Sequence, residues 1–131
     1  MGFIAYKTGD GHVAPIEYLP AEAGIYDIGM ALAYNTDSHQ LAASTTPKYI
    51  CVGSKEIKTA GAELPCIKIA DGMVFETALS AAGAVYPGSA YWVTADGKKV
   101  APTGTEGQNK FVVEYAAGAA AGDLVRGHFV S

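Results

Sequence analysis

The stretch Tyr26-Asp-Ile-Gly-Met-Ala-Leu-Ala-Tyr-Asn-Thr-Asp-Ser-His-Gln-Leu41 decides how this chain is interpreted, because a later stretch resembles it. The later stretch is Gly88-Ser-Ala-Tyr-Trp-Val-Thr-Ala-Asp-Gly-Lys-Lys-Val100, which lies 59 residues further on (88 − 29 = 59). Each contains an apolar run, a turn with an Asp and a second apolar residue, which is the pattern of a β-hairpin. Self-similarity at a constant spacing indicates a repeated structural unit. The matching pairs are Gly29 and Gly88, Ala31 and Ala90, Tyr34 and Val93, Asp37 and Asp96, and Leu41 and Val100.

Two further segments repeat in the same order. Lys110-Phe-Val-Val resembles Lys48-Tyr-Ile-Cys at a spacing of 62 residues. Ala121-Gly-Asp-Leu-Val-Arg resembles Ala60-Gly-Ala-Glu-Leu-Pro-Cys, with Asp123 matched to Glu63 and Leu124 to Leu64 at a spacing of 60. The spacing between matching segments varies by a few residues, as expected when surface loops of the two units differ in length. We therefore expect two related β-units.

Length and composition favour one all-β domain. A chain of 131 residues is one domain by default, and it can bury about two-thirds of its unfolded surface without disulfides or metal. Hydrophobic residues make up 50% and charged residues 17%, and 16 glycines separate short β-prone runs. We expect either a compact β-sandwich or a small β-barrel, with little or no helix. The expected parts are an N-terminal arm at residues 1–12, a first β-unit at 13–77, a connector at 78–85 and a second β-unit at 86–131.

Charge and hydropathy limit the classes of partner. The formal net charge is −4 and the chain has 9 basic residues, which argues against nucleic acid because phosphate binding needs clustered Lys and Arg. Neither a signal peptide nor a membrane-spanning run of about 20 apolar residues is recognisable, so no membrane partner is expected. The chain is expected to be made in the cytoplasm. Cys51 and Cys66 are then expected to be buried thiols, with a disulfide between neighbouring strands as the alternative.

No motif for catalysis or cofactor binding is present. The three histidines, His12, His39 and His128, have no spacing typical of metal ligands, and the chain has no Cys-x-x-Cys pair. Nucleophile elbows, Walker loops and dinucleotide-binding turns are also missing. We therefore predict no catalytic residue, no cofactor and no metal, and the chain is not expected to be an enzyme. A composite site of His128 with carboxylates from elsewhere is the alternative.

Two stretches are candidate contact surfaces. The extended terminus Phe3, Ile4, Ala5, Tyr6 and Lys7 can add as a strand to a partner or complete its own sheet. Tyr91 and Trp92 are adjacent in a predicted strand and must point to opposite faces, so one is expected in the core and the other at the surface. An exposed aromatic side chain there is suited to binding a sugar or a protein.

The residues of the first half resemble a known family. The chain carries, in this order, the segments Ile16–Ala21, Gly29–Leu32, Thr46–Cys51, Ala60–Ile69 and Val74–Thr77. This set resembles the decoration and head-fibre proteins of tailed-phage capsids. The similarity is greatest to the small domain that begins the head-fibre proteins of phages infecting Gram-positive bacteria. In the second half, Ala120-Ala-Gly-Asp-Leu-Val-Arg126 after a Gly-Lys hairpin is similar to another capsid-decoration pattern.

The resemblance implies a structural virion protein on the outer surface of an assembled head. Its partner would be the major capsid protein, and it would cluster as a homo-trimer or another homo-oligomer on the capsid after synthesis in the host cytoplasm. Such proteins have no active site. Because the chain stops at Ser131, we expect a compact decoration or cement protein without a long fibre. The alternative, motivated by Tyr91 and Trp92, is a carbohydrate-binding or adhesion module, which could also be displayed on a virion.

Overall fold

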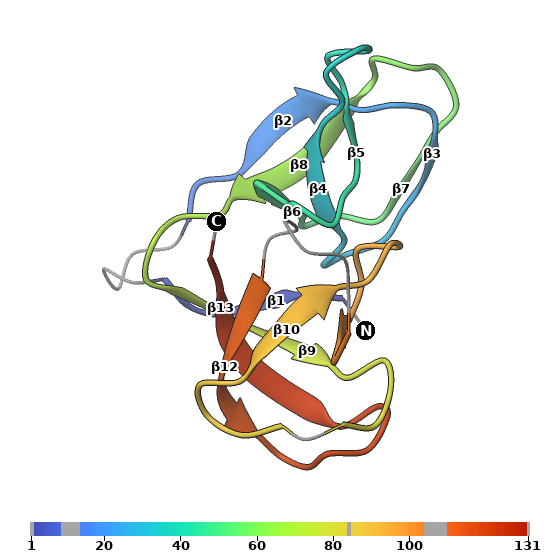
Figure 1. Ribbon diagram of the computed structural model, residues 1–131. Helices are drawn as coiled ribbons and strands as arrows, with labels where there is room; N and C mark the ends of the chain where they lie inside the picture. Colours follow the sequence, from blue (N-terminus) through green and yellow to red (C-terminus); the bar gives the residue numbers. More distant parts are fainter. Residues whose placement is uncertain (1, 9–13, 84, 104–109, 131) are drawn as a thin grey trace.

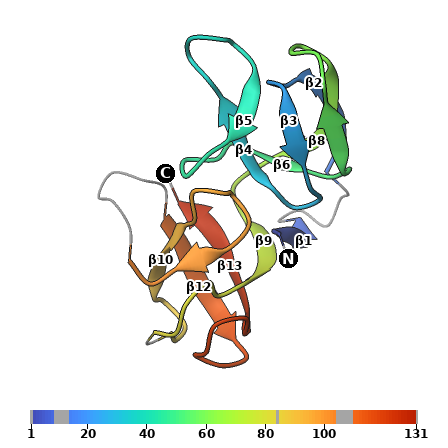
Figure 2. The ribbon, with the colours of Figure 1, turned by 90° about the vertical axis from the view of Figure 1, so that its right-hand side faces the viewer.

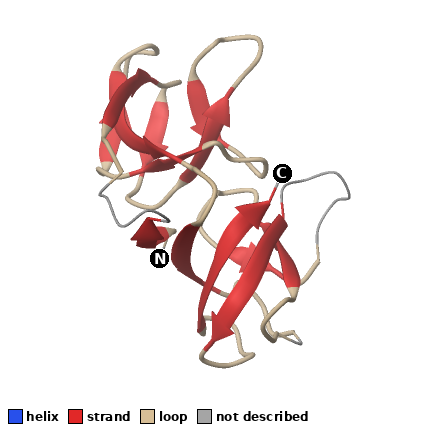
Figure 3. Ribbon diagram, turned by 90° about the vertical axis from the view of Figure 1, so that its left-hand side faces the viewer, coloured by secondary structure: helices blue, strands red, loops and turns tan. Residues whose placement is uncertain are grey.

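The structure, a computed structural model, describes residues 2–8, 14–83, 85–103 and 110–130. All regular secondary structure in these residues is β-strand, so the expected all-β fold is confirmed (Figure 3). The strands are β1 (Ile4–Thr8), β2 (Glu17–Pro20), β3 (Gly24–Tyr26), β4 (Ala31–Tyr34), β5 (Leu41–Ala43), β6 (Tyr49–Cys51), β7 (Lys55–Ile57), β8 (Glu63–Lys68), β9 (Met73–Ala78), β10 (Ala90–Val93), β11 (Val100–Ala101), β12 (Lys110–Ala116) and β13 (Leu124–Val130).

The strands form two lobes that lie one above the other in Figure 1 and are seen from the side in Figure 2. One lobe contains a five-stranded sheet in the order β2-β8-β6-β4-β5, together with the short pair β3-β7. The other lobe contains a six-stranded sheet in the order β1-β9-β13-β12-β10-β11. If β1 is set aside, the two sheets have the same strand order. β2, β4, β5, β6 and β8 correspond in turn to β9, β10, β11, β12 and β13.

Each sheet curls until its two ends meet. In the first lobe a parallel bridge joins Ala21, just after β2, to Leu41 in β5. In the second lobe the equivalent bridge joins Leu79, just after β9, to Val100 in β11. Each lobe is therefore a small five-stranded β-barrel, and closing the sheet in this way removes most of its free edges.

The strand registers confirm that the two units are related. Tyr34 pairs with Leu41 in the first hairpin, and Val93 pairs with Val100 in the second. Both pairs lie at the spacing of 59 found in the sequence. The correspondence extends into the next ladders, where each pair of the first barrel has its counterpart in the second. These pairs are Ala31–Ile50 and Ala90–Val112, Leu32–Tyr49 and Tyr91–Phe111, and Cys51–Cys66 and Val113–Gly127.

The boundary between the units differs from the sequence-based expectation. β9 was expected to end the first unit, but it pairs with β13 and opens the second barrel as the counterpart of β2. The expected connector at 78–85 also begins too early, because Ala78 still belongs to β9 and Leu79 forms the closing bridge. The chain passes between the barrels at the Asp71-Gly72 turn instead. β2 and β9 share few residue types, so the repeat leaves no trace in the sequence at this point.

The structure aligns the last strands of the two units, β8 and β13, with a shift of one residue from the alignment made on the sequence. The N–H of Gly61 donates to the carbonyl of Ala21 at 2.9 Å, and the N–H of Gly122 donates to the carbonyl of Leu79 at 2.8 Å. These equivalent turns are 61 residues apart, so Leu64 corresponds to Val125 and the match with Leu124 is wrong. Side chains alternate across a strand, and only this register points both residues into their barrels, where both are buried.

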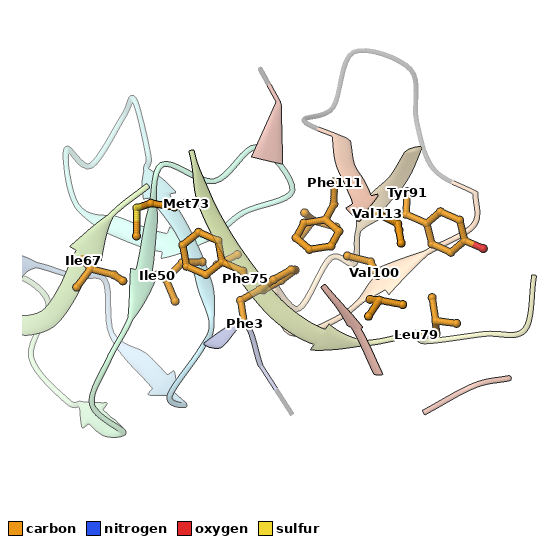
Figure 4. Close-up of a cluster of buried hydrophobic side chains, with 13 residues drawn as sticks. Phe3, Ile50, Ile67, Met73, Phe75, Leu79, Tyr91, Val100, Phe111 and Val113 are labelled. Carbon is orange, nitrogen blue, oxygen red and sulfur yellow. The ribbon is translucent and has the colours of Figure 1, made fainter. Parts of the chain in front are cut away.

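Two apolar clusters hold the lobes together. The first fills the first barrel and consists of Ala21, Tyr26, Met30, Leu32, Leu41, Cys51, Ile57, Leu64 and Cys66. The second fills the second barrel and continues to the outer face of the first, where it includes Ile50 and Ile67 (Figure 4). Ala31 belongs to the same cluster. Because one cluster spans both lobes, the barrels are joined by a core and not only by the chain.

Candidate interaction surfaces

The N-terminal segment is built into its own fold. β1 pairs antiparallel with β9 and is the outermost strand of the six-stranded sheet. Phe3 is only 1% exposed, and its ring lies 5.6 Å from that of Phe111 and 5.0 Å from that of Phe129. Its N–H donates to the carbonyl of Gly29 at 2.7 Å. The alternative in which this terminus completes its own sheet is therefore confirmed, and the choice of Phe3 as a contact residue is wrong because its side chain is in the core.

The rest of this segment remains a candidate contact. Ile4 is 47% exposed and Ala5 is also exposed, whereas the side chains of Tyr6 and Lys7 lie outside what the structure describes, as do residues 9–12 of the expected arm. The outer edge of β1 has no partner strand in the described part of the chain. A contact by Ile4 and Ala5 thus stays a prediction, and it would be made by a docked edge strand.

Tyr91 and Trp92 divide between core and surface as expected. Tyr91 is 3% exposed and belongs to the core, whereas Trp92 faces outward and is partly exposed. The Nζ of Lys110, the cross-strand partner of Trp92, lies 5.7 Å from the centre of the indole ring. The indole Nε1 is buried and has no acceptor among the residues described. A surface platform of two aromatic rings is therefore excluded here, and Trp92 alone remains.

Sequence reasoning missed a sheet edge with two exposed apolar side chains. Ile16 is 55% exposed and Tyr18 is 64% exposed, and both point outward from the start of β2. Pro15 indicated an edge strand, because proline cannot donate to a ladder. The alternation of Ile16, Glu17, Tyr18 and Leu19 placed Ile16 and Tyr18 on one face. It did not show which face was outside, because that depends on how the barrel closes.

A second overlooked cluster lies at the mouth of the first barrel. Glu17, Lys68, Tyr49 and Tyr34 follow one another across four neighbouring strands on the same face. The rings of Tyr34 and Tyr49 meet edge to face at 5.7 Å. Burial raises the pKa of the Tyr49 hydroxyl, and the negative charge of Glu17 adds to the effect. The cluster combines aromatic rings with one carboxylate and one ammonium group.

The same place in the second barrel has a different chemistry. By strand register, Glu17, Tyr49 and Lys68 correspond to Phe75, Phe111 and Phe129. The ring of Phe129 contacts those of Phe75 and Phe111 at 5.3 and 5.2 Å, and Phe3 completes the group. The mouth of the second barrel is thus closed by phenylalanine rings, whereas the first presents polar groups.

The titratable groups form no reactive constellation in the described part of the chain. Cys51 and Cys66 lie opposite each other as free, buried thiols, which confirms that expectation. Burial raises the pKa of Cys66 to about 11, with a smaller contribution from Glu17, so this thiol is protonated at neutral pH. His128 lies 2.8 Å from Glu114 at the surface, His39 is in an exposed turn, and His12 lies outside the described residues. No three potential metal ligands gather among the residues described.

The cavity at the junction of the barrels is small. An open pocket of about 110 Å³ is lined by Lys48, Ile69, Asp71 and Phe129, among others. Sites for small organic ligands usually have volumes of about 300–1,000 Å³. This pocket is large enough for a few water molecules.

Comparison of the sequence with protein-family models and with curated proteins finds no match. None of the described residues forms a helix long and apolar enough to cross a membrane.

Proposed function

We propose that this chain is a structural virion protein that binds the outer surface of an assembled phage capsid and stabilises it. The observation that carries the proposal is the pair of sheet edges with exposed apolar side chains, one on each barrel. Ile4 marks the edge of β1, and Ile16 and Tyr18 mark the edge of β2. The ordered resemblance to capsid-decoration proteins supports the same function.

The fold is suited to joining neighbouring subunits. Because the two barrels share one core, they form a body that holds its two edges at a set separation. A protein that contacts two capsid subunits in this way makes its second contact intramolecularly, which strengthens binding without further contacts. Since it binds the assembled lattice and not free subunits, it shifts the equilibrium toward the assembled state. Clustering as a homo-trimer or another homo-oligomer on the lattice would multiply this effect.

Binding to purified heads tests the proposal. The chain is mixed with expanded heads of the phage that encodes it, and bound protein is measured by sedimentation. We expect saturable binding to expanded heads, weaker binding to unexpanded heads, and a higher temperature of head disruption when the sites are full. If sedimentation with expanded heads is no greater than for an unrelated β-protein of similar charge, the proposal is wrong.

The carbohydrate-binding alternative is favoured by one observation, the Tyr34–Tyr49 pair beside Glu17 and Lys68. Aromatic rings next to hydrogen-bonding groups suit the flat face and hydroxyl groups of a sugar. A glycan array with the intact chain and with Tyr34→Ala tests it, and Trp92→Ala serves as the control at a partly exposed ring of the second barrel. Loss of a signal in Tyr34→Ala but not in Trp92→Ala would favour this function, and no signal across a broad array would exclude it.

A further inference from the structure

We propose that the outer edge of β2 accepts an extended segment of a capsid subunit as an added antiparallel strand, in the place that β1 occupies on β9. The inference rests on the proposed function, because it takes the occupant from the capsid lattice. It is carried by the internal repeat, which shows the same edge twice, covered by β1 in one barrel and without a partner strand among the described residues in the other.

The outer edges of β2 and β9 are equivalent, because the two strands pair with β8 and β13 at corresponding residues. In the second barrel Phe75 pairs with Gly127 and Glu76 with Arg126. In the first barrel Glu17 pairs with Cys66 and Tyr18 with Pro65. The closing bridges after β2 and β9 match as well. Tyr18 is therefore equivalent to Glu76, and Glu17 to Phe75. Because Ile4 pairs with Glu76 and Ala5 with Phe75, an added strand would place its residues opposite Tyr18 and Glu17 in the same way.

The uncovered edge is apolar where its counterpart is polar. Glu76 and Arg126 form an ion pair at 2.8 Å beside β1, and the guanidinium group lies 5.0 Å from the ring centre of Tyr115. At the equivalent place the first barrel has Tyr18 and Pro65. No strand pairs with this edge of β2 within the described ranges. Exposed strand edges with large apolar side chains are templates for further pairing, and soluble proteins usually protect them with charge.

The repeat also indicates the chemistry of the occupant. The residue opposite Tyr18 takes the place of Ile4, on the outer face next to Ile16, and should be apolar. The residue opposite Glu17 takes the place of Ala5 and should be small. The residue before these two takes the place of Phe3, but here it meets Tyr49 and Lys68 in place of two phenylalanines. It should therefore carry a hydrogen-bonding group, because a bare ring would leave those polar groups unpaired.

A second copy of this chain is the competing occupant. If β2 paired with β2 of another copy about Glu17, two carboxylates would lie directly opposite each other, which is unfavourable. The self-complementary register about Glu17 is thus opposed by charge, whereas a segment with a small neutral residue at that position is not. This difference, together with the proposed function, is why we assign the edge to the capsid.

Charged substitutions on the edge test the inference. Ile16→Lys and Tyr18→Asp place charge where the added strand would cover it, and Ile25→Lys on β3, where the side chain is 71% exposed, is the matched control. Binding to expanded heads is measured by sedimentation, the oligomeric state by light scattering, and folding by thermal unfolding. Hydrogen exchange of the amides of Ile16 and Tyr18 is compared with and without heads, because these N–H groups face away from β8 and would donate to an added strand, which slows exchange.

We expect both edge variants to bind heads about tenfold more weakly or worse, and Ile25→Lys to bind as the unaltered chain does. The amides of Ile16 and Tyr18 should gain protection in the complex. If the unaltered chain binds heads but the edge variants bind equally well, or if these amides gain no protection, the inference is wrong while the proposed function stands. If the edge variants lose only an oligomer in solution, the occupant is a second copy and the inference is also wrong. If the unaltered chain does not bind heads, the proposed function itself fails.

Discussion

Gly29 and Gly88 occupy the same position in the two barrels, but only Gly29 is pressed against another segment. Both have positive φ angles, 87° and 93°, and the N–H of each donates at 2.7 Å to the equivalent carbonyl, that of Cys51 or Val113. A Cβ on Gly29 would lie 2.6 Å from the backbone nitrogen of Phe3, whereas a Cβ on Gly88 would meet nothing within 4 Å. The repeat thus supplies two glycines that share a conformation and differ in contact.

Substitution of these two glycines should separate backbone strain from the docking of β1. Both Gly29→Ala and Gly88→Ala force an L-residue into a left-handed conformation, which costs about 1–3 kcal/mol. Gly29→Ala should cost about 1–3 kcal/mol more, because backbone atoms of the N-terminal segment must move. Urea unfolding measures both free energies. Equal losses would mean that the N-terminal segment is not docked against Gly29.

Truncation of Phe3 should destabilise the fold strongly. Phe3→Ala removes a buried ring from the group formed with Phe111 and Phe129, so we expect a loss of about 3–5 kcal/mol in the free energy of unfolding. Ile4→Ala, at the exposed neighbouring position, should cost less than about 1 kcal/mol. A small loss from Phe3→Ala would contradict its place in the core. Deletion of the N-terminal segment is consequently a poor test of capsid contact, because it would also damage the core.

Replacement of Trp92 by phenylalanine should leave stability unchanged or raise it slightly. The indole Nε1–H is buried without an acceptor among the described residues, and such a group costs about 1–3 kcal/mol. Trp92→Phe removes that donor and keeps a ring beneath the Lys110 ammonium group. Thermal unfolding checks this prediction. A loss of about 2 kcal/mol or more would show that Nε1 donates a hydrogen bond in the folded chain.

Stability should fall at alkaline pH, partly through Cys66. Burial raises the pKa of this thiol from 9.0 to about 11, so the folded chain keeps a proton that the unfolded chain releases. The resulting stabilisation is complete below pH 9.0 and is lost as the pH rises through about 11. Cys66→Ala should therefore flatten the decline of the unfolding free energy across this range. Because burial also raises the pKa of Tyr26, some decline should remain. An identical slope in the two proteins would exclude this role of Cys66.

Much of the fold could be inferred from the residues alone. The repeated hairpins and the strands around Tyr49 and Phe111 follow from apolar runs and turn residues that are close together in the sequence. The spacing of 59 follows from comparing the two hairpin stretches with each other. The separation of Tyr91 from Trp92 follows from the alternation of side chains in a strand. Burial of Cys51 and Cys66 follows from their place in apolar strands.

The candidate surfaces could not be inferred in the same way. The alternation around Ile16 and Tyr18 is that of any half-buried strand. The apolar stretch that begins at Phe3 has the composition of a free N-terminal arm. Whether each side chain is covered depends on segments that are distant in sequence. The N-terminal segment with Phe3 packs beside β9, whereas no second strand lies beside Tyr18 among the described residues. The pairing of Phe3 with Phe111 and Phe129 joins residues more than a hundred positions apart, and no local pattern records it.

The sequence by itself determined that this protein is an all-β chain of two related units, because hairpins and strand faces depend on near neighbours. Only the tertiary structure decided that each unit closes into a barrel, that β9 opens the second unit, and that the N-terminus covers one of two equivalent edges. Those outcomes depend on the pairing of whole strands and on a core shared between the barrels. Such pairings are selected by the total surface they bury, which no single stretch of residues specifies.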